Sequence, residues 1–232
     1  MKKAQSVILM TAFVLMAGCM TQRAWVYRSS SYPTPPSTSP KKVVVLPFKD
    51  MRENVNKNRI VFYAIPLMPF GWATYDAPEG ADVHITSRLW VNYKPVEDFA
   101  KALAEELNAT GRFQEAFFDF KKGDADLVIQ GTIHSTKYEG KILSYGLSVY
   151  GPMLWLIGLP ATTAANELQV ELECVDLASE NVVFRKRYEA PRYGATSWIY
   201  VLRNDFNYPS MLQTVYRQFI DDLANAIQLT RR

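Results

Sequence analysis

Few residues of this chain have the type and spacing that catalysis or metal binding requires. His84 and His134 are the only histidines, and they belong to separate predicted elements. Cys174 follows an alternating pattern that places it on the apolar face of a strand, where a thiol is buried and inert. Acidic residues such as Glu106 show no spacing that demands acid–base work and are assigned to solvated faces. We therefore expect a protein that is not an enzyme and that holds no metal ion and no cofactor.

Cys19 has the clearest predicted chemistry, because it ends a short export signal. Residues 1–18 begin with a basic pair, continue through an uncharged, largely apolar stretch and end in Ala17 and Gly18. This arrangement is typical of a signal peptide, which is too short to remain as a membrane span. The alternative is an ordinary cleaved signal beside a chance cysteine.

Residues Leu15 to Cys19 resemble the lipobox of bacterial lipoproteins, in which the cysteine is diacylated, the signal is removed before it and the new amine is acylated. Met16 stands where the lipobox usually has Leu. The resemblance implies that Cys19 carries lipid such as palmitate, and two or more acyl chains anchor a protein stably. An Asp directly after the lipidated cysteine would resemble an inner-membrane retention signal, and this chain has Met20 at that position. The implied location is the periplasmic face of the outer membrane.

Charge and composition divide the mature chain into two parts. All 23 acidic residues lie at Asp50 or beyond it. Residues 19–41 are rich in Pro and Ser and contain little to bury, which predicts an extended tether. Residues 42–232 have the size and composition of a single globular domain. This body lacks a basic surplus, so nucleic acid is not an expected partner.

Hydrophobic periodicity predicts a helix over 96–109 and a long C-terminal helix over 210–229, in which Phe219 and Leu223 face the core. A continuous apolar run over 43–48 is typical of a central strand that is buried on both faces. Alternating apolar residues predict further strands in the middle of the chain.

Two of these strands form a predicted hairpin in which Cys174 lies opposite Phe184 and Asn181 takes the left-handed position of the turn. The order of elements predicts an α+β (three-layer α/β) fold. Its sheet is mixed and mostly antiparallel, with an early helix and a long C-terminal helix packed on it.

Several motifs resemble, in their order, those of the TolB amino-terminal-type domain. They are VVVLPF, FAKALAEEL, ADLVIQGTI, VELECVDLASENVVFRKRY and the closing amphipathic helix. That domain also occurs in the curli-secretion lipoprotein and in small outer-membrane lipoproteins of assembly systems. The resemblance spans about residues 43 to 230 and implies a periplasmic scaffold or a subunit of an oligomer.

Two segments without charged residues interrupt this pattern. The first apolar segment covers 60–72 and the second covers 142–166. Pro and Gly cut both below the length of a membrane-spanning helix. Three interpretations stay open: burial against the core, an interface with a partner or a second copy, and a loop that dips into a membrane. The candidate contact residues are Phe62, Tyr63, Phe70, Trp72, Tyr150, Met153, Trp155 and Leu156.

The function expected from these features is that of a non-catalytic, lipid-anchored cell-envelope protein that serves as a scaffold or as a subunit of an assembly or secretion system. The expected partners are the membrane, through the lipid on Cys19, and envelope proteins or further copies of this chain. The alternative is a periplasmic module that binds lipid or glycan through the aromatic residues of the two apolar segments.

Overall fold

The computed structural model describes residues 23–33, 39–79, 81, 90–91, 93–201 and 203–230. The signal peptide, Cys19 and His84 lie outside these residues. The helices and strands are β1 (Arg23–Ala24), β2 (Ser39–Val45), β3 (Lys49–Asp50), β4 (Val55–Arg59), η1 (Ile60–Ala64), β5 (Phe70–Asp76), β6 (Trp90–Val91), α2 (Pro95–Thr110), β7 (Phe113–Phe118), β8 (Leu127–Ser135), β9 (Tyr138–Leu143), η3 (Ser148–Tyr150), α3 (Pro152–Leu156), β10 (Thr162–Asp176), β11 (Asn181–Ser197) and α4 (Tyr208–Thr230).

The main sheet has nine strands and is built around the long hairpin of β10 and β11. One edge of β10 pairs first with β9 and then with β8, so these two short strands follow each other along a single long one. Beyond β9 lie β5 and β4, and beyond β8 lie β2 and β7. Most pairs are antiparallel, whereas β2 and β3 run parallel to β8. The expected mixed, mostly antiparallel sheet is confirmed.

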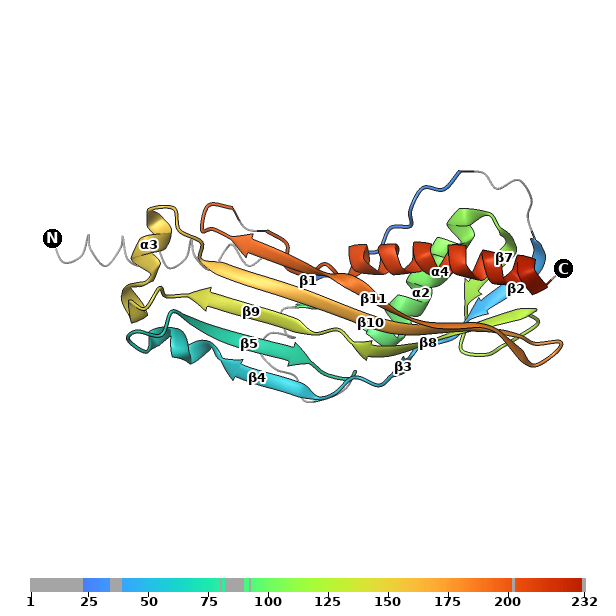
Figure 1. Ribbon diagram of the computed structural model, residues 1–232, viewed down its shortest axis with the longest axis horizontal. Helices are drawn as coiled ribbons and strands as arrows, with labels where there is room; N and C mark the ends of the chain where they lie inside the picture. Colours follow the sequence, from blue (N-terminus) through green and yellow to red (C-terminus); the bar gives the residue numbers. More distant parts are fainter. Residues whose placement is uncertain are drawn as a thin grey trace, which may run out of the picture.

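The sheet extends well beyond the helices that cover it. In Figure 1, α2 and α4 lie over the half that contains β2, β7 and β8, and the other half projects away from them as an arm made of β4, β5, β9 and the joined ends of β10 and β11. The arm ends in η1, η3 and α3 (Figure 1). The molecule therefore has a helix-covered body and a long strand arm.

The core lies between the helices and one face of the body. The side chain of Phe219 in α4 is 0% exposed and that of Leu223 is 1% exposed, as the helix periodicity predicts. Both helices pack on the strand residues of one cluster, which includes Val43 and Val45 of β2, whereas Val44 points to a smaller cluster on the other face. The described residues thus form the expected α+β fold, in which both helices pack on the same face of the sheet.

The first helix and the hairpin follow from local sequence signals. Helix α2 begins at Pro95, carries Glu97 and Asp98 in its first turn and ends at Gly111, whose φ is 62°. Cys174 pairs with Phe184 in the hairpin, as predicted, because a bulge follows Cys174. The left-handed turn residue is Glu180, with φ 56°, and the prediction of Asn181 is wrong.

Residues 25–33 pack on the helical layer, which corrects the expectation of a tether that buries little. Trp25 lies against Phe99 of α2, with ring centroids 5.6 Å apart. The fully buried carboxylate of Glu106 accepts hydrogen bonds from the hydroxyls of Tyr27 and Tyr32, at 2.8 and 2.6 Å, and from a backbone amide. Glu106 is therefore not on a solvated face, because the N-terminal segment covers it and satisfies its charge.

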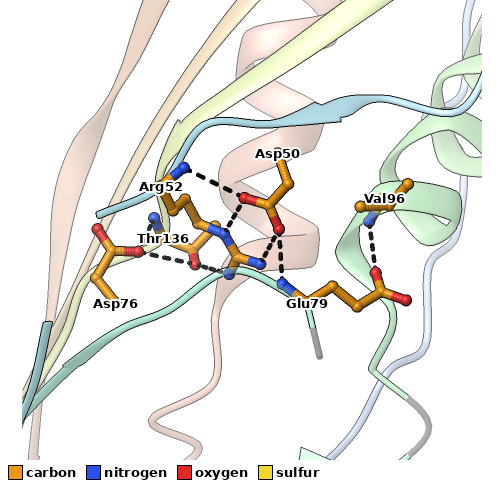
Figure 2. Close-up of polar contacts among 6 residues, drawn as sticks. All are labelled: Asp50, Arg52, Asp76, Glu79, Val96 and Thr136. Atoms are coloured by element: carbon orange, nitrogen blue, oxygen red, sulfur yellow. Dashed lines mark hydrogen bonds and ion pairs between the residues drawn. The ribbon is translucent and has the colours of Figure 1, made fainter. Parts of the chain in front are cut away.

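A buried ionic cluster closes the junction between the body and the arm (Figure 2). The side chain of Arg52 is 2% exposed. Its Nε and Nη2 donate to the two carboxylate oxygens of Asp50, at 2.9 and 2.7 Å, and its Nη1 donates to Thr136 Oγ1 at 2.6 Å. Thr136 lies between β8 and β9, where β10 changes its partner. The backbone amide of Thr136 in turn donates to Asp76 of β5, at 2.9 Å.

The two carboxylates of this cluster respond differently to their surroundings. Burial raises the pKa of Asp50, but hydrogen bonds from Arg52 and from the Glu79 amide outweigh it and hold that pKa below its usual value. Burial also raises the pKa of Asp76, and there the hydrogen bonds from Ser135 and Thr136 offset it only in part. Asp50 therefore stabilises the fold at neutral pH, and this contribution is lost as the pH falls through its lowered pKa.

Replacing Arg52 with Met should destabilise the protein by about 3 to 5 kcal/mol at neutral pH, because Asp50 and Asp76 would remain buried without a counter-charge. Urea unfolding monitored by tryptophan fluorescence measures this cost. The difference from wild type should shrink below about pH 4, where the carboxylates become protonated. An equal loss of stability in an exposed control, Arg185→Met, would contradict this role for Arg52.

Candidate functional site: the apolar tip of the arm

The structure brings the two apolar segments together at the end of the arm. Phe70 of β5 pairs with Leu143 of β9. Beyond this pair, the amides of Ser144 and Tyr145 both donate to the carbonyl of Pro69, at 2.9 Å, and the Leu67 amide donates to the carbonyl of Gly146 at 2.9 Å. Hydrogen bonds between the segments thus hold their loops as one unit, which we call the apolar tip.

The apolar tip exposes a concentration of large apolar side chains. The exposed fraction lies between 46% and 88% for the residues Val61, Ile65, Leu67, Leu147, Val149, Tyr150, Met153, Leu156 and Ile157. These residues lie within two segments that contain no charge. Scattered apolar residues are normal on a protein surface, whereas a concentration of large exposed apolar residues is typical of surfaces that bind a partner or a membrane.

A third segment completes the apolar tip, and our sequence reasoning missed it. The turn after β11 exposes Ile199, Tyr200 and Val201, at 38%, 63% and 54%. The Tyr200 hydroxyl donates to the Leu156 carbonyl, which ties this turn to α3. A signal was present in the sequence, because residues 193–202 also form a charge-free run with two Tyr and a Trp, bounded by Arg192 and Arg203.

The predicted contact residues divide into two groups. Tyr150, Met153 and Leu156 are exposed on the loop and helix that form the outer end. Phe62, Tyr63, Phe70, Trp72 and Trp155 are partly buried. Phe62 and Phe70 both meet Trp72 edge to face, with centroids 5.3 and 6.0 Å away. Trp155 donates its indole N–H to the Leu143 carbonyl at 2.9 Å. The second group therefore supports the surface that the first group presents.

Two cations lie on the strands next to the apolar tip, one on each side of Trp72. Arg59, Trp72 and Lys141 are register partners across β4, β5 and β9. The Arg59 guanidinium lies 5.7 Å from the Phe62 ring centroid, and the Lys141 ammonium lies 4.8 Å from that of Phe70. Within the described part of the chain, neither cation forms an ion pair with a carboxylate. The apolar tip thus has an apolar outer end, and cationic and aromatic side chains lie where it joins the rest of the arm.

The backbone of the apolar tip is strained at an exposed residue. Leu67 has φ 68° although its side chain is 88% exposed. The left-handed region is unfavourable in conformational free energy for a residue with a Cβ, and an exposed side chain makes few packing contacts that would offset it. Gly or Asn would suit this position better if stability alone were selected. Such a residue is typical of a functional surface.

A polar groove lies on the arm beside Trp72, with a volume of about 660 Å³. Its lining combines this Trp with charged and polar groups, which include Lys57, Asp76, His134 and Gln169. Among the residues that the structure describes, none is a hydrogen-bond partner of His134 Nε2, which lies 3.7 Å from a Glu171 oxygen. An aromatic ring next to polar donors and acceptors can bind a sugar or another polar ligand.

The described residues contain no group of three or more His, Cys, Asp or Glu side chains that could hold a metal ion. Cys174 is fully buried, and burial raises the pKa of its thiol to about 12, which agrees with an inert cysteine. In the part of the chain that the structure describes, no helix is both long enough and apolar enough to span a membrane.

Comparison with solved structures supports the fold. The chain is similar to protein XCC0632 from Xanthomonas campestris, of family DUF330, with a TM-score of 0.51 at 12% identity over 91% of this chain and 100% of that one. The PelC dodecamer from Paraburkholderia phytofirmans aligns with a TM-score of only 0.36 at 14% identity, over 82% of this chain and 96% of that one. No protein-family model and no curated protein matches the sequence.

These comparisons establish a shared fold with XCC0632 and nothing about activity. The similarity to PelC is too low to carry a conclusion. The resemblance to the TolB amino-terminal-type domain stays a prediction.

The apolar tip should come apart when Gly151 is replaced with Ala. A Cβ at this position would lie 2.6 Å from the Cα and carbonyl oxygen of Ser144, which is closer than real Cβ atoms approach. We expect faster hydrogen exchange at the amides of Ser144 and Tyr145, while the amides of β8 keep their protection. Gly158→Ala is the matched control, because no atom of the described residues lies within 4 Å of the added Cβ, although its φ of 99° adds local strain. Unchanged exchange at Ser144 in the Gly151 variant would show that the loops are not locked together.

Proposed function

We propose that this protein is a non-catalytic, lipid-anchored component of the bacterial cell envelope, and that the apolar tip is its working surface. The observation that carries the proposal is the exposed apolar end of the arm, which the fold builds from three charge-free segments and supports with backbone hydrogen bonds. A stable domain does not need such a surface, and exposing it in water is unfavourable unless a partner or a membrane covers it.

The N-terminus supports a role at the membrane. The signal peptide and the lipobox-like residues before Cys19 predict export and acylation. The packing of residues 25–33 on the helices leaves a short chain between Cys19 and the body. A protein with this anchor would be held close to the periplasmic face of the outer membrane, as a scaffold or as a subunit of an assembly or secretion system.

Metabolic labelling with a palmitate analogue tests the anchor. The wild-type chain should be labelled and should fractionate with the outer membrane, because the thiol of Cys19 is the acceptor. Cys19→Ser should be unlabelled, whereas Cys174→Ser should label like wild type, since that thiol is buried. Equal labelling of wild type and Cys19→Ser would overturn the lipoprotein assignment.

The second candidate function is glycan binding, which the polar groove beside Trp72 favours. Sugar rings stack on aromatic side chains, and the surrounding polar groups can bind hydroxyls. The two functions separate in a pull-down with insoluble peptidoglycan. Retention of the wild type and loss of retention in Gln169→Ala would support the groove as the working site, and the absence of retention would leave the apolar tip in that role.

A further inference from the structure

The composition of the arm changes in order along its length, and this order indicates what covers the apolar tip. The outer end exposes aliphatic residues and two tyrosines, Tyr150 and Tyr200. The next row across the sheet contains Arg59, Trp72 and Lys141. The row further inboard contains Lys57 and Glu139, on either side of Thr74. Apolar, aromatic and basic groups in this sequence match the hydrocarbon, interface and headgroup layers of a bilayer.

We propose that the apolar tip is a second membrane-attachment site, which inserts shallowly into the interface of a bilayer that contains anionic phospholipid. The inference deepens the proposed function, because it names the occupant of the tip, and it rests in part on the acylation of Cys19.

Charge complementarity favours a lipid surface over a second copy of this chain. The cations of Arg59 and Lys141 lie on aromatic rings and have long, flexible stems that can reach a phosphate. The segments 60–75 and 142–166 contain no acidic residue. If two tips met symmetrically, each would bring the same cations and no carboxylates from these segments to the contact. Anionic headgroups supply the missing negative charge.

The chain between Cys19 and the body is short, so an acylated Cys19 would keep the body close to a membrane. Three residues, Met20 to Gln22, separate Cys19 from Arg23, the first described residue, and the four steps from one Cα to the next span at most about 14 Å. Trp25 is fixed against α2. Acyl chains on Cys19 would therefore hold the body next to the bilayer, and the high local concentration would allow even a weak affinity of the tip to act.

The strained, exposed Leu67 fits this role. Leu67 is exposed, so contacts within the protein do little to offset the conformational free energy of its left-handed backbone. Transfer of its side chain into an apolar medium would offset that free energy. Asn tolerates the left-handed conformation and does not favour hydrocarbon. Leu67→Asn should therefore preserve or raise the melting temperature while it weakens the binding to membranes.

Vesicle flotation of the unacylated protein tests the inference. The probe is the mature chain from residue 19 with Cys19→Ser, mixed with vesicles of phosphatidylcholine alone or with added phosphatidylglycerol. We expect binding that is tighter with phosphatidylglycerol and that weakens with salt. Leu67→Asn combined with Ile157→Asn should weaken binding at least about tenfold, because two apolar side chains leave the lipid.

Two matched controls isolate the tip. Phe120, which is 66% exposed, lies at the opposite end of the sheet, and Phe120→Asn should bind like wild type. Arg59→Gln with Lys141→Gln should lose about fivefold for each charge on phosphatidylglycerol vesicles. This pair should change little on phosphatidylcholine alone, and Lys121→Gln with Lys122→Gln should change little on both.

The inference is overturned if the wild type binds neither vesicle, or if the Leu67/Ile157 variant binds as tightly as wild type. If gel filtration instead shows an oligomer that the Leu67/Ile157 variant converts to a monomer, with no vesicle binding, the occupant is a second copy of this chain. Failure here with successful labelling of Cys19 would remove the membrane role of the tip and leave the lipoprotein assignment intact. Failure of the labelling would remove the lipoprotein assignment itself.

Discussion

Arg52 carries a positive charge into the interior at the point where β10 changes its pairing partner from β9 to β8. β10 is longer than any strand that pairs with it on its β8 edge, so that edge must be completed by β8 and β9 in succession, and the chain between them leaves the ladder at Thr136. A break of this kind exposes backbone and side-chain polar groups inside the protein, which is unfavourable unless each finds a partner. Arg52, Asp50 and Asp76 supply these partners (Figure 2). The arm can project from the helix-covered body because this junction is closed.

The division into a body and an arm separates the part that stabilises the fold from the part that exposes the apolar surface. The body obtains its stability from helices packed on one face of the sheet, with Phe219 and Leu223 in the centre. The arm carries surface residues that the core does not need, at a distance from the helices (Figure 1). The outer end can therefore be apolar, strained at Leu67 and free of charge without loosening the core. A surface that is unfavourable in water is tolerated there because the stability of the fold is supplied elsewhere.

Much of the fold could be predicted from the sequence, because its signals are local. Pro95 and Gly111 bound α2, and the alternation through Cys174 sets the register with Phe184. The buried state of Glu106 could not be predicted, since it depends on Tyr27 and Tyr32, which lie more than seventy residues away along the chain. For the tip, the absence of charge identified two of its three segments. The position of Arg59 and Lys141 on either side of Trp72 depends on the register of the strands, which the composition of the segments does not indicate.

The most direct test of the account is the environment of the apolar tip in the complete, lipidated protein. Cys174 is fully buried, so a fluorophore sensitive to polarity can be attached to Leu67→Cys after acylation has consumed the thiol of Cys19. In native outer-membrane fractions, the account predicts blue-shifted emission at position 67, which quenchers carried by lipid acyl chains reduce, and water-like emission from the same label at Phe120→Cys. Water-like emission at both positions, with no effect of the lipid quenchers, would contradict the claim that the apolar tip enters a membrane.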